Sequence, residues 1–159
     1  MAKKEEKTNV MRVLEQKQIP YTAHAYPADG PTDGVSVANI LGQDVEQVFK
    51  TLVTKAASGT YYVFDIPVAE SLDLKKAAKA VGEKSIAMIP QKDLLPLTGY
   101  IHGGCSPIGM KKQFATFIDE IAETKETICF SGGKVGHQVR TTLENLRKAV
   151  TVTSADIVK

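Results

Sequence analysis

Residues 48–67 read VFKTLVTKAASGTYYVFDIP, and this stretch decides the fold. Two runs rich in β-branched and aromatic residues flank a short Ala-Ser-Gly-Thr segment, which is the pattern of a β-hairpin. Successive side chains of a strand point to opposite faces, so Lys50 shares a face with Val48 and Leu52. The hairpin therefore carries a lysine among apolar residues in the body of a strand.

Helices and further strands are predicted on both sides of this hairpin. Apolar residues at helical spacing, with capping residues in front of them, predict four helices and a short helical turn. Asp44 and Gln47 have the spacing of a capping box. The predicted helices start near Val10, capped by Thr8 or Asn9, and cover 35–41, 74–81 behind Asp73, and the segment from Thr142 or Thr141 to 149, with the turn at 90–97. Further strands are predicted at 21–26, 85–89, 116–119, 127–130 and 150–153.

Because strands and helices are interspersed, one α+β domain is expected, with a mixed, curled, barrel-like sheet flanked by helices. The length of 159 residues fits one domain. We expect residues 1–9 to form a charged, flexible N-terminus and residues 10–159 to form the folded domain. No internal repeat or linker interrupts it.

Charge and composition exclude several classes of protein. Lys and Arg number 20 against 18 Asp and Glu, which leaves a net charge of +2, and 43% of the residues are hydrophobic. These values are typical of globular proteins and argue against disordered, fibrous or globally cationic chains. A local nucleic-acid site remains compatible with them, because such a site depends on where charges lie.

The expected location is the cytoplasm, with no membrane association. The N-terminal residues lack the apolar region of an export signal, and no apolar run has the 18 residues of a spanning helix. Cys105 and Cys129 are accordingly predicted to be free thiols. His24, His102 and His137 are scattered singly, so no metal site and no cofactor are expected.

Lys50 is the strongest single candidate for chemistry. Desolvation favours the neutral amine, and an ammonium kept charged there needs an anionic or carbonyl partner, often a ligand. A lysine that reaches the surface along its aliphatic chain, or one paired with a buried carboxylate, explains the same position. Position alone does not decide between these readings.

Two glycine-rich loops are further candidates. Residues 103–109 (GGCSPIG) and 131–136 (SGGKVG) can bring backbone N–H donors close to an oxyanion, although structural tight turns give the same pattern. Cys105, with His102 nearby, invites a nucleophile hypothesis, but nothing in the sequence indicates a lowered thiol pKa. Cys129 lies in an apolar run and is expected to pack in the core, and Tyr26 either lines a pocket or packs in the core. Candidate phosphate contacts are Lys111, Lys112, Lys134 and Arg140.

Four motifs in this order resemble the YbaK/EbsC family of aminoacyl-tRNA deacylases. They are VFKTL at 48–52, LDLKK at 72–76, TGY at 98–100 followed by GGCSP at 103–107, and SGGK at 131–134. The resemblance spans the chain from about Val10 to its C-terminus. It is closest to the branch that clears Cys-tRNA(Pro), rather than to the relatives that clear Ala-tRNA(Pro).

The resemblance implies a free-standing relative of the editing domain inserted in bacterial prolyl-tRNA synthetases, which removes an amino acid that the synthetase pocket fails to reject. Its implied partners are the acceptor end of a mischarged tRNA and prolyl-tRNA synthetase. Lys50 matches the family's functional lysine. The other positions that the resemblance assigns to substrate binding are Tyr26, Gly103, Gly104, Pro107, Ser131, Gly132 and Gly133, with Lys134 as a tRNA contact.

In this branch the thiol of the substrate cysteine attacks its own ester carbonyl and releases the tRNA and a cyclic thiolactone. A broader Ala- or Ser-tRNA deacylase, and a non-catalytic module that binds tRNA or nucleotides, are the alternatives. The sequence departs from the family pattern at Cys105, where an aliphatic residue is expected, at Asp33 and Gly34, near an expected aromatic, and at Gln138, in place of an acid. These departures leave the amino-acid preference open.

Overall fold

The hairpin forms as the sequence predicts. In the computed structural model, which describes residues 7–159, β2 (Phe49–Ala56) pairs antiparallel with β3 (Tyr61–Pro67). Lys50 lies opposite Ile66, and Thr51 lies opposite Asp65. This register brings the lysine motif next to a buried stretch of β3.

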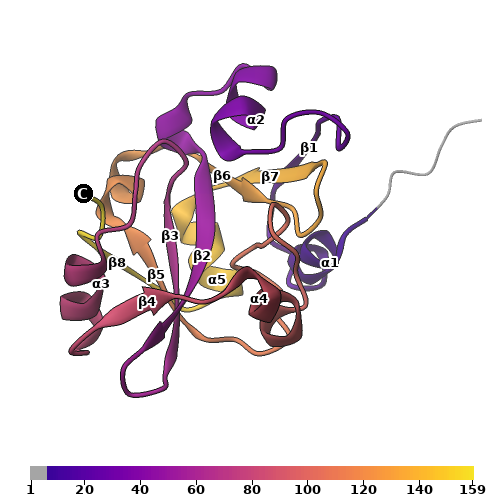
Figure 1. The fold of residues 1–159 in the computed structure, drawn as a ribbon. Helices are drawn as coiled ribbons and strands as arrows, with labels where there is room; N and C mark the ends of the chain where they lie inside the picture. Colours follow the sequence, from indigo (N-terminus) through magenta and orange to yellow (C-terminus); the bar gives the residue numbers. More distant parts are fainter. Residues whose placement is uncertain (1–6) are drawn as a thin grey trace, which may run out of the picture.

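A five-stranded mixed sheet grows from the hairpin (Figure 1). The strands follow the order β4-β2-β3-β5-β8, in which β3–β5 and β5–β8 are parallel pairs and the other two are antiparallel. The added strands are β4 (Ile86–Met88), β5 (Ala115–Asp119) and β8 (Val152–Ala155). The predicted α+β class with a mixed sheet is confirmed.

A second, antiparallel sheet contains β1 (Thr22–Ala25), β7 (His137–Thr141) and β6 (Ile128–Ser131), in the order β1-β7-β6. Between the two sheets the structure records one isolated bridge, Val48 to Cys129. The expectation of a single curled, barrel-like sheet is therefore not confirmed, because the described strands form two sheets, neither of which closes. The central strand β7 was not predicted, since it is largely polar.

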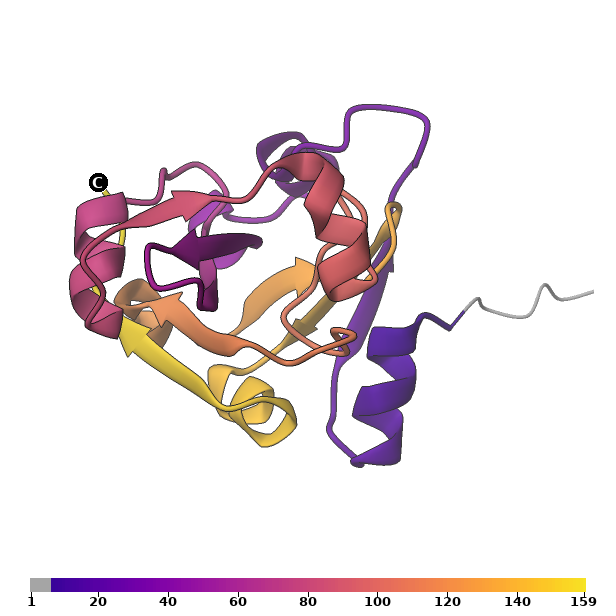
Figure 2. The same cartoon turned by 60° about the horizontal axis from the view of Figure 1, so that its bottom comes forward.

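Five helices and two 3-10 turns complete the described fold. They are α1 (Asn9–Gln16), α2 (Gly34–Ile40), η1 (Val45–Gln47), α3 (Leu74–Val81), α4 (Gln91–Thr98), η2 (Glu120–Thr124) and α5 (Leu143–Ala149). Side chains of Thr8, Asp73 and Thr142 accept hydrogen bonds from backbone N–H groups of the helices that they cap, as predicted. Figures 1 and 2 place α1 and α3 at opposite ends of the molecule.

The predicted capping box at Asp44 is wrong. Asp44 accepts a hydrogen bond from the Glu46 N–H (2.9 Å), but it starts only the 3-10 turn η1. The Gln47 amide donates instead to the Thr127 carbonyl (3.4 Å) and ties η1 to the segment before β6. This hydrogen bond to a residue distant in the sequence thus replaces the bond within the turn that a capping box requires.

Most of the predicted flexible N-terminus, residues 1–6, lies outside the described residues. Thr8 caps α1, and Asn9 is its first residue. The Asn9 side chain also donates a hydrogen bond to the Gly109 carbonyl (3.2 Å). Helix α1 therefore includes Asn9, which was assigned to the N-terminal segment, and the domain boundaries stay a prediction.

The two faces of β2 pack in different parts of the core. Phe49 and Val53 belong to the larger apolar cluster, together with residues of α1, whereas Leu52 and Ala56 pack with the cluster under α3. Lys50 shares the second face but lies near the N-terminal end of the strand, where it is half-buried. No helix in the described chain is both long enough and apolar enough to span a bilayer.

Candidate functional site

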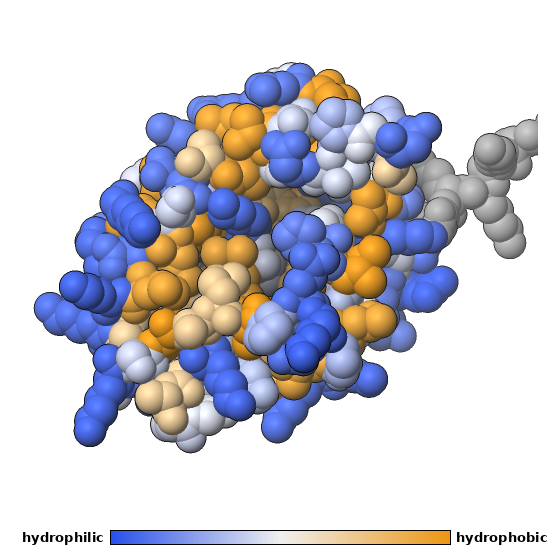
Figure 3. All heavy atoms as spheres, in the orientation of Figure 1, coloured by the Kyte–Doolittle hydropathy of each residue, from blue (hydrophilic) through white to orange (hydrophobic). Residues whose placement is uncertain are grey.

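A pocket of about 330 Å³ is lined by residues of both β2 and β6, which belong to different sheets, and Val48, which bridges to Cys129, also lines it. This volume lies in the range of small-molecule sites. Figure 3 shows the hollow on the face seen in Figure 1, below α2. The lining includes apolar Val37, Val48, Phe49, Leu52, Val68, Leu94 and Phe130, and polar Thr32, Lys50, Thr51, His102, Ser131, His137 and Gln138.

Lys50 lines this pocket and is half-buried. Desolvation lowers the pKa of its ammonium, and the negative charge of exposed Glu70 acts in the opposite direction. No carboxylate among residues 7–159 forms an ion pair with Lys50, so the alternative of a lysine paired with a buried carboxylate is not supported. Lys50 therefore presents a partly desolvated cation to the pocket.

The loop after α4 reaches the pocket through three of its residues, His102, Gly103 and Cys105. Gly103 has a φ of 87°, which favours glycine. Gly104 is buried, its N–H donates to the Ile101 carbonyl (3.0 Å), and an added Cβ would lie 3.2 Å from the Val135 nitrogen. Pro107 is also buried and does not line the pocket. Gly104 and Pro107 therefore shape the loop from behind the pocket wall.

Of the Ser131 motif, only Ser131 itself lines the pocket. Its Oγ accepts a hydrogen bond from the Gly133 N–H (3.1 Å), which leaves the hydroxyl proton available to a ligand. Gly133 has a φ of 92°, and a Cβ there would lie 2.7 Å from a methyl carbon of Val10. Gly132 is buried, and Lys134 is exposed outside the pocket lining.

Tyr26 lines the pocket from the segment just after β1. Its backbone N–H donates to the Gly136 carbonyl (3.0 Å), which joins this segment to the turn before β7. The sequence left open whether Tyr26 lines a pocket or packs in the core, and the structure places it at the pocket, half-buried.

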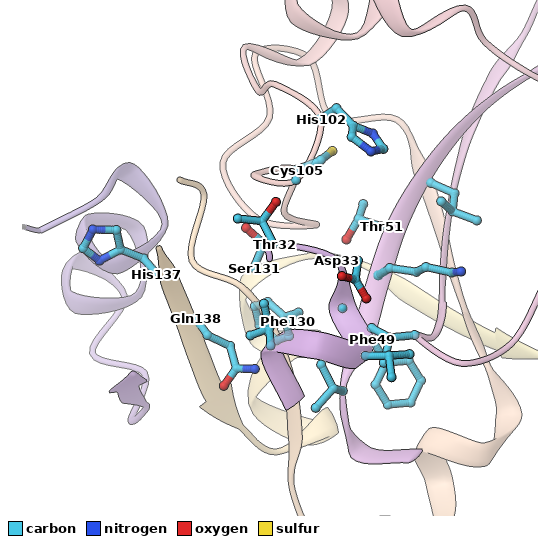
Figure 4. Close-up of a pocket in the computed structure, with 18 of the residues that line it drawn as sticks. Thr32, Asp33, Phe49, Thr51, His102, Cys105, Phe130, Ser131, His137 and Gln138 are labelled. Atoms are coloured by element: carbon cyan, nitrogen blue, oxygen red, sulfur yellow. The ribbon is translucent and has the colours of Figure 1, made fainter. Parts of the chain in front are cut away.

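Cys105 and His102 both line the pocket, and Figure 4 shows their side chains extending from the same loop, with Thr51 across from them on β2. Burial raises the pKa of the Cys105 thiol to about 12, and the charge of Asp65 adds to this effect. At neutral pH the thiol stays protonated, so the structure does not support Cys105 as a nucleophile.

Cys129 and three of the candidate phosphate contacts lie outside the pocket lining; these contacts are Lys111, Lys112 and Arg140. Cys129 is fully buried, as predicted, and its sulfur accepts a hydrogen bond from Arg140 Nε (3.5 Å). Lys111 and Lys112 are exposed, and the Lys112 ammonium lies 5.9 Å from the centre of the Phe114 ring. The Arg140 guanidinium is thus hydrogen-bonded within the fold, to the Cys129 sulfur.

All four residues at which the sequence departs from the family pattern line the pocket: Asp33, Gly34, Cys105 and Gln138. Asp33 caps α2 by accepting the Ser36 N–H (3.1 Å), and a Cβ on Gly34 would lie 2.2 Å from Val68 Cγ1, so the fold needs glycine there. Gln138 is buried, and its amide exchanges two hydrogen bonds with the Gln43 amide (2.7 and 2.9 Å). The two glutamines fix the segment after α2 against β7.

Sequence reasoning missed three residues that the structure brings to this site or directly behind it. Thr51 lines the pocket beside Lys50 and donates a hydrogen bond from Oγ1 to Asp65 Oδ1 (2.5 Å). Gln43 holds Gln138. A charged residue within the apolar run YYVFDIP was the available signal for Asp65, whereas Gln43 gave none, because its partner lies 95 residues away.

Comparison with known proteins identifies the family. The aminoacyl-tRNA editing domain family matches residues 32–149. A protein of Enterococcus faecalis (strain ATCC 700802 / V583), provisionally named Cys-tRNA(Pro)/Cys-tRNA(Cys) deacylase EbsC, is 46% identical over 142 residues, which cover 87% of each chain.

Solved structures share the fold. A protein described as a provisional trans-editing enzyme for prolyl tRNA synthetase has a TM-score of 0.82 at 25% identity, with 95% of each chain covered. A hypothetical protein has a TM-score of 0.87 at 18% identity, covering 96% of this chain and 100% of its own, and it bears on the fold alone. From the family match and the 46% identical relative, the chain belongs to the aminoacyl-tRNA editing domain family.

Proposed function

We propose that this protein is a trans-editing aminoacyl-tRNA deacylase that clears cysteine from mischarged Cys-tRNA(Pro), and also from Cys-tRNA(Cys). The observation that carries the proposal is the partly desolvated Lys50 cation in a pocket with apolar walls. Family membership and the name of the Enterococcus faecalis relative support the same reaction class.

The chemistry requires little from the protein. An aminoacyl ester is already activated, so orientation and stabilisation of developing negative charge account for most of the catalysis. Lys50 holds the 3′-terminal adenosine or the ester carbonyl region. The Gly103 backbone N–H and the Ser131 hydroxyl, from two residues of the pocket lining, donate hydrogen bonds to the substrate.

Cleavage proceeds by substrate assistance. The sulfur of the cysteinyl group attacks its own ester carbonyl, a C–S bond forms, the C–O bond to the ribose breaks, and the thiol proton passes to the departing 3′-oxygen of the tRNA. The products are uncharged tRNA and a cyclic thiolactone. Tyr26 contributes to the substrate wall, Gly104, Pro107, Gly132 and Gly133 shape the two loops, and Lys134 contacts tRNA outside the pocket.

A small domain of this kind gains tRNA selectivity from a partner. The acceptor end of the tRNA is the part that a 330 Å³ pocket can receive. Prolyl-tRNA synthetase supplies recognition of the rest, and the structural relative described as a trans-editing enzyme for that synthetase supports this choice of partner. Co-elution of the two proteins with tRNA(Pro) tests the association.

The experiment that tests the function is a deacylation panel on Cys-, Ala- and Ser-tRNA(Pro) and on Cys-tRNA(Cys). We expect both cysteinyl substrates to be cleaved fastest, with a thiolactone detected by mass spectrometry. Faster cleavage of Ala- or Ser-tRNA(Pro) would establish the broader deacylase instead. Binding of every tRNA without cleavage of any would establish a non-catalytic module.

A further inference from the structure

Asp65 is the residue behind the pocket that the reaction scheme leaves unused. Its side chain is 1% exposed, and Oδ1 accepts the Thr51 hydroxyl at 2.5 Å. Within residues 7–159, Asp65 Oδ2 and His24 Nε2 are the buried side-chain polar atoms that have no hydrogen-bond partner. Such an orphaned carboxylate oxygen is costly and therefore needs an explanation.

Burial raises the pKa of Asp65 to about 7, against the opposing effect of the Thr51 hydrogen bond. The carboxyl group is thus ionised to a substantial extent at neutral pH. Thr51 and Cys105 both line the pocket, and the Asp65 charge acts on the Cys105 thiol. Above about pH 7 a negative charge therefore lies directly behind this part of the pocket wall, whereas below that pH the carboxyl group is mostly protonated.

The hydrogen bond from Thr51 to Asp65 determines whether Thr51 can donate a hydrogen bond to a ligand or accept one from it. Thr51 has one hydroxyl proton, and that proton is donated inward to Asp65. Its oxygen then has only lone pairs left, so it can accept, but not donate, a hydrogen bond from a bound molecule. An acceptor backed by an anion favours a cationic donor over a neutral one.

We propose that Asp65 is a positioning residue that holds Thr51 as the hydrogen-bond acceptor for the α-ammonium of the bound aminoacyl group. The inference rests on the proposed deacylase function and adds the part of the substrate that this wall recognises. Lys50 and the Asp65–Thr51 pair then orient the aminoacyl ester through charges of opposite sign, with the ester group near the lysine and the amine near the threonine.

The test combines a change in the substrate with a change in the protein. Cys-tRNA(Pro) and N-acetyl-Cys-tRNA(Pro) are compared as substrates, because acetylation removes the charge of the amine and leaves the thiol. With the wild type, acetylation should lower kcat/KM by about tenfold or more, as expected for loss of a charge-assisted hydrogen bond. Asp65→Asn and Thr51→Val should lower kcat/KM for the free amine and reduce the acetylation effect to less than about threefold.

Two further variants separate positioning from loss of structure. Thr51→Ser retains the hydroxyl and should retain the acetylation effect. Asp119→Asn changes a buried aspartate that does not line the pocket and should retain it as well. If Asp65→Asn shows the full wild-type acetylation effect, the inference is wrong.

The outcome of the wild type distinguishes this inference from the proposed function. If the wild type cleaves neither ester, the proposed function fails, and the same comparison is made by calorimetry with 3′-cysteinylamino-adenosine and its N-acetyl form. A preference of the wild type for the free amine that is lost in Asp65→Asn supports the inference there. Equal binding of both compounds by the wild type overturns it.

Discussion

Asp65 and Asp119 lie on neighbouring parallel strands of one sheet, and both are buried, at 1% and 3% exposure. Asp119 accepts backbone hydrogen bonds at both oxygens, from Ile121 (3.1 Å) and Ile157 (3.2 Å), and so fixes η2 and the C-terminal segment. Among residues 7–159, Asp65 Oδ1 has the Thr51 hydroxyl as its partner and Oδ2 has none. Asp119, whose two carboxylate oxygens are both hydrogen-bonded, thus supports the fold, whereas Asp65, which has one unpaired oxygen, lies behind the pocket.

Two lysines repeat the contrast. Lys76, on α3, donates to Asp156 Oδ1 (3.1 Å) and to the Val158 carbonyl (2.9 Å), and it ties that helix to the C-terminal segment. Lys50, at the pocket, is half-buried and forms no ion pair with any of residues 7–159. The Lys76 ammonium is thus paired within the protein, whereas the Lys50 ammonium is left for a ligand.

The largest expected effect is on the pH dependence of stability. The pKa of Asp65 is raised from 3.8 to about 7 in the fold, so the native state holds a proton that the unfolded chain has lost. Its contribution therefore becomes less favourable as pH rises between about 4 and 7, by on the order of 4 kcal/mol. Urea unfolding across this range should give a flatter curve for Asp65→Asn than for the wild type, and parallel curves would contradict the contrast.

Lys50→Ala tests the contrast between the lysines. Loss of a charge that acts on the transition state should lower kcat/KM for Cys-tRNA(Pro) by about 100-fold, with little change in thermal stability. Lys76→Ala is the matched control and should retain activity within about twofold. The roles would be wrongly assigned if Lys50→Ala deacylated at the wild-type rate while remaining folded.

Gly34→Ala probes the packing that forms the pocket wall. The new Cβ would lie 2.2 Å from Val68 Cγ1, and both residues line the pocket. Overpacking of this kind should cost about 2 kcal/mol in the free energy of unfolding. Gly30→Ala, where a Cβ meets nothing within 4 Å, should leave stability almost unchanged. Equal stability of the two variants would show that the pocket wall adjusts to the added methyl group without a loss of stability.

The smallest effect is expected from Gln43→Ala. This change leaves the buried Gln138 amide without its two hydrogen bonds. A cost of about 1 kcal/mol is expected, together with a changed ratio of Cys- to Ala-tRNA(Pro) cleavage, because Gln138 lines the pocket. An unchanged ratio would mean that the orientation of Gln138 does not affect substrate choice.

Local signals predicted much of the fold. Asp73 with Gly82 marked both ends of α3, and the alternating residues of 48–67 gave the hairpin, since caps and periodicity act over a few residues. Strand β7 escaped prediction because His137 and Arg140 make it polar, and its burial comes from pairing with β1 and β6 on both sides. Separation into two sheets depends on the same long-range pairing.

The site was predicted in part for the same reason. Lys50, Gly103 and Ser131 stood out by an unusual position or by glycine-rich surroundings, and all three line the pocket. Gly104 and Gly132 belong to the same motifs but face the interior, which sequence spacing does not specify. The role of Asp65 follows only from its hydrogen bond with Thr51 and from its unpaired oxygen, and both of these depend on strand register.

The most direct test of the contrast is a paired measurement on Asp65→Asn and Asp119→Asn at about pH 8, where melting temperature and the rate of Cys-tRNA(Pro) deacylation are recorded for each. Asp65→Asn should melt above the wild type and deacylate at least about tenfold more slowly. Asp119→Asn should melt below the wild type and keep its rate per folded molecule. A lower melting temperature for Asp65→Asn with an unchanged rate would contradict the account.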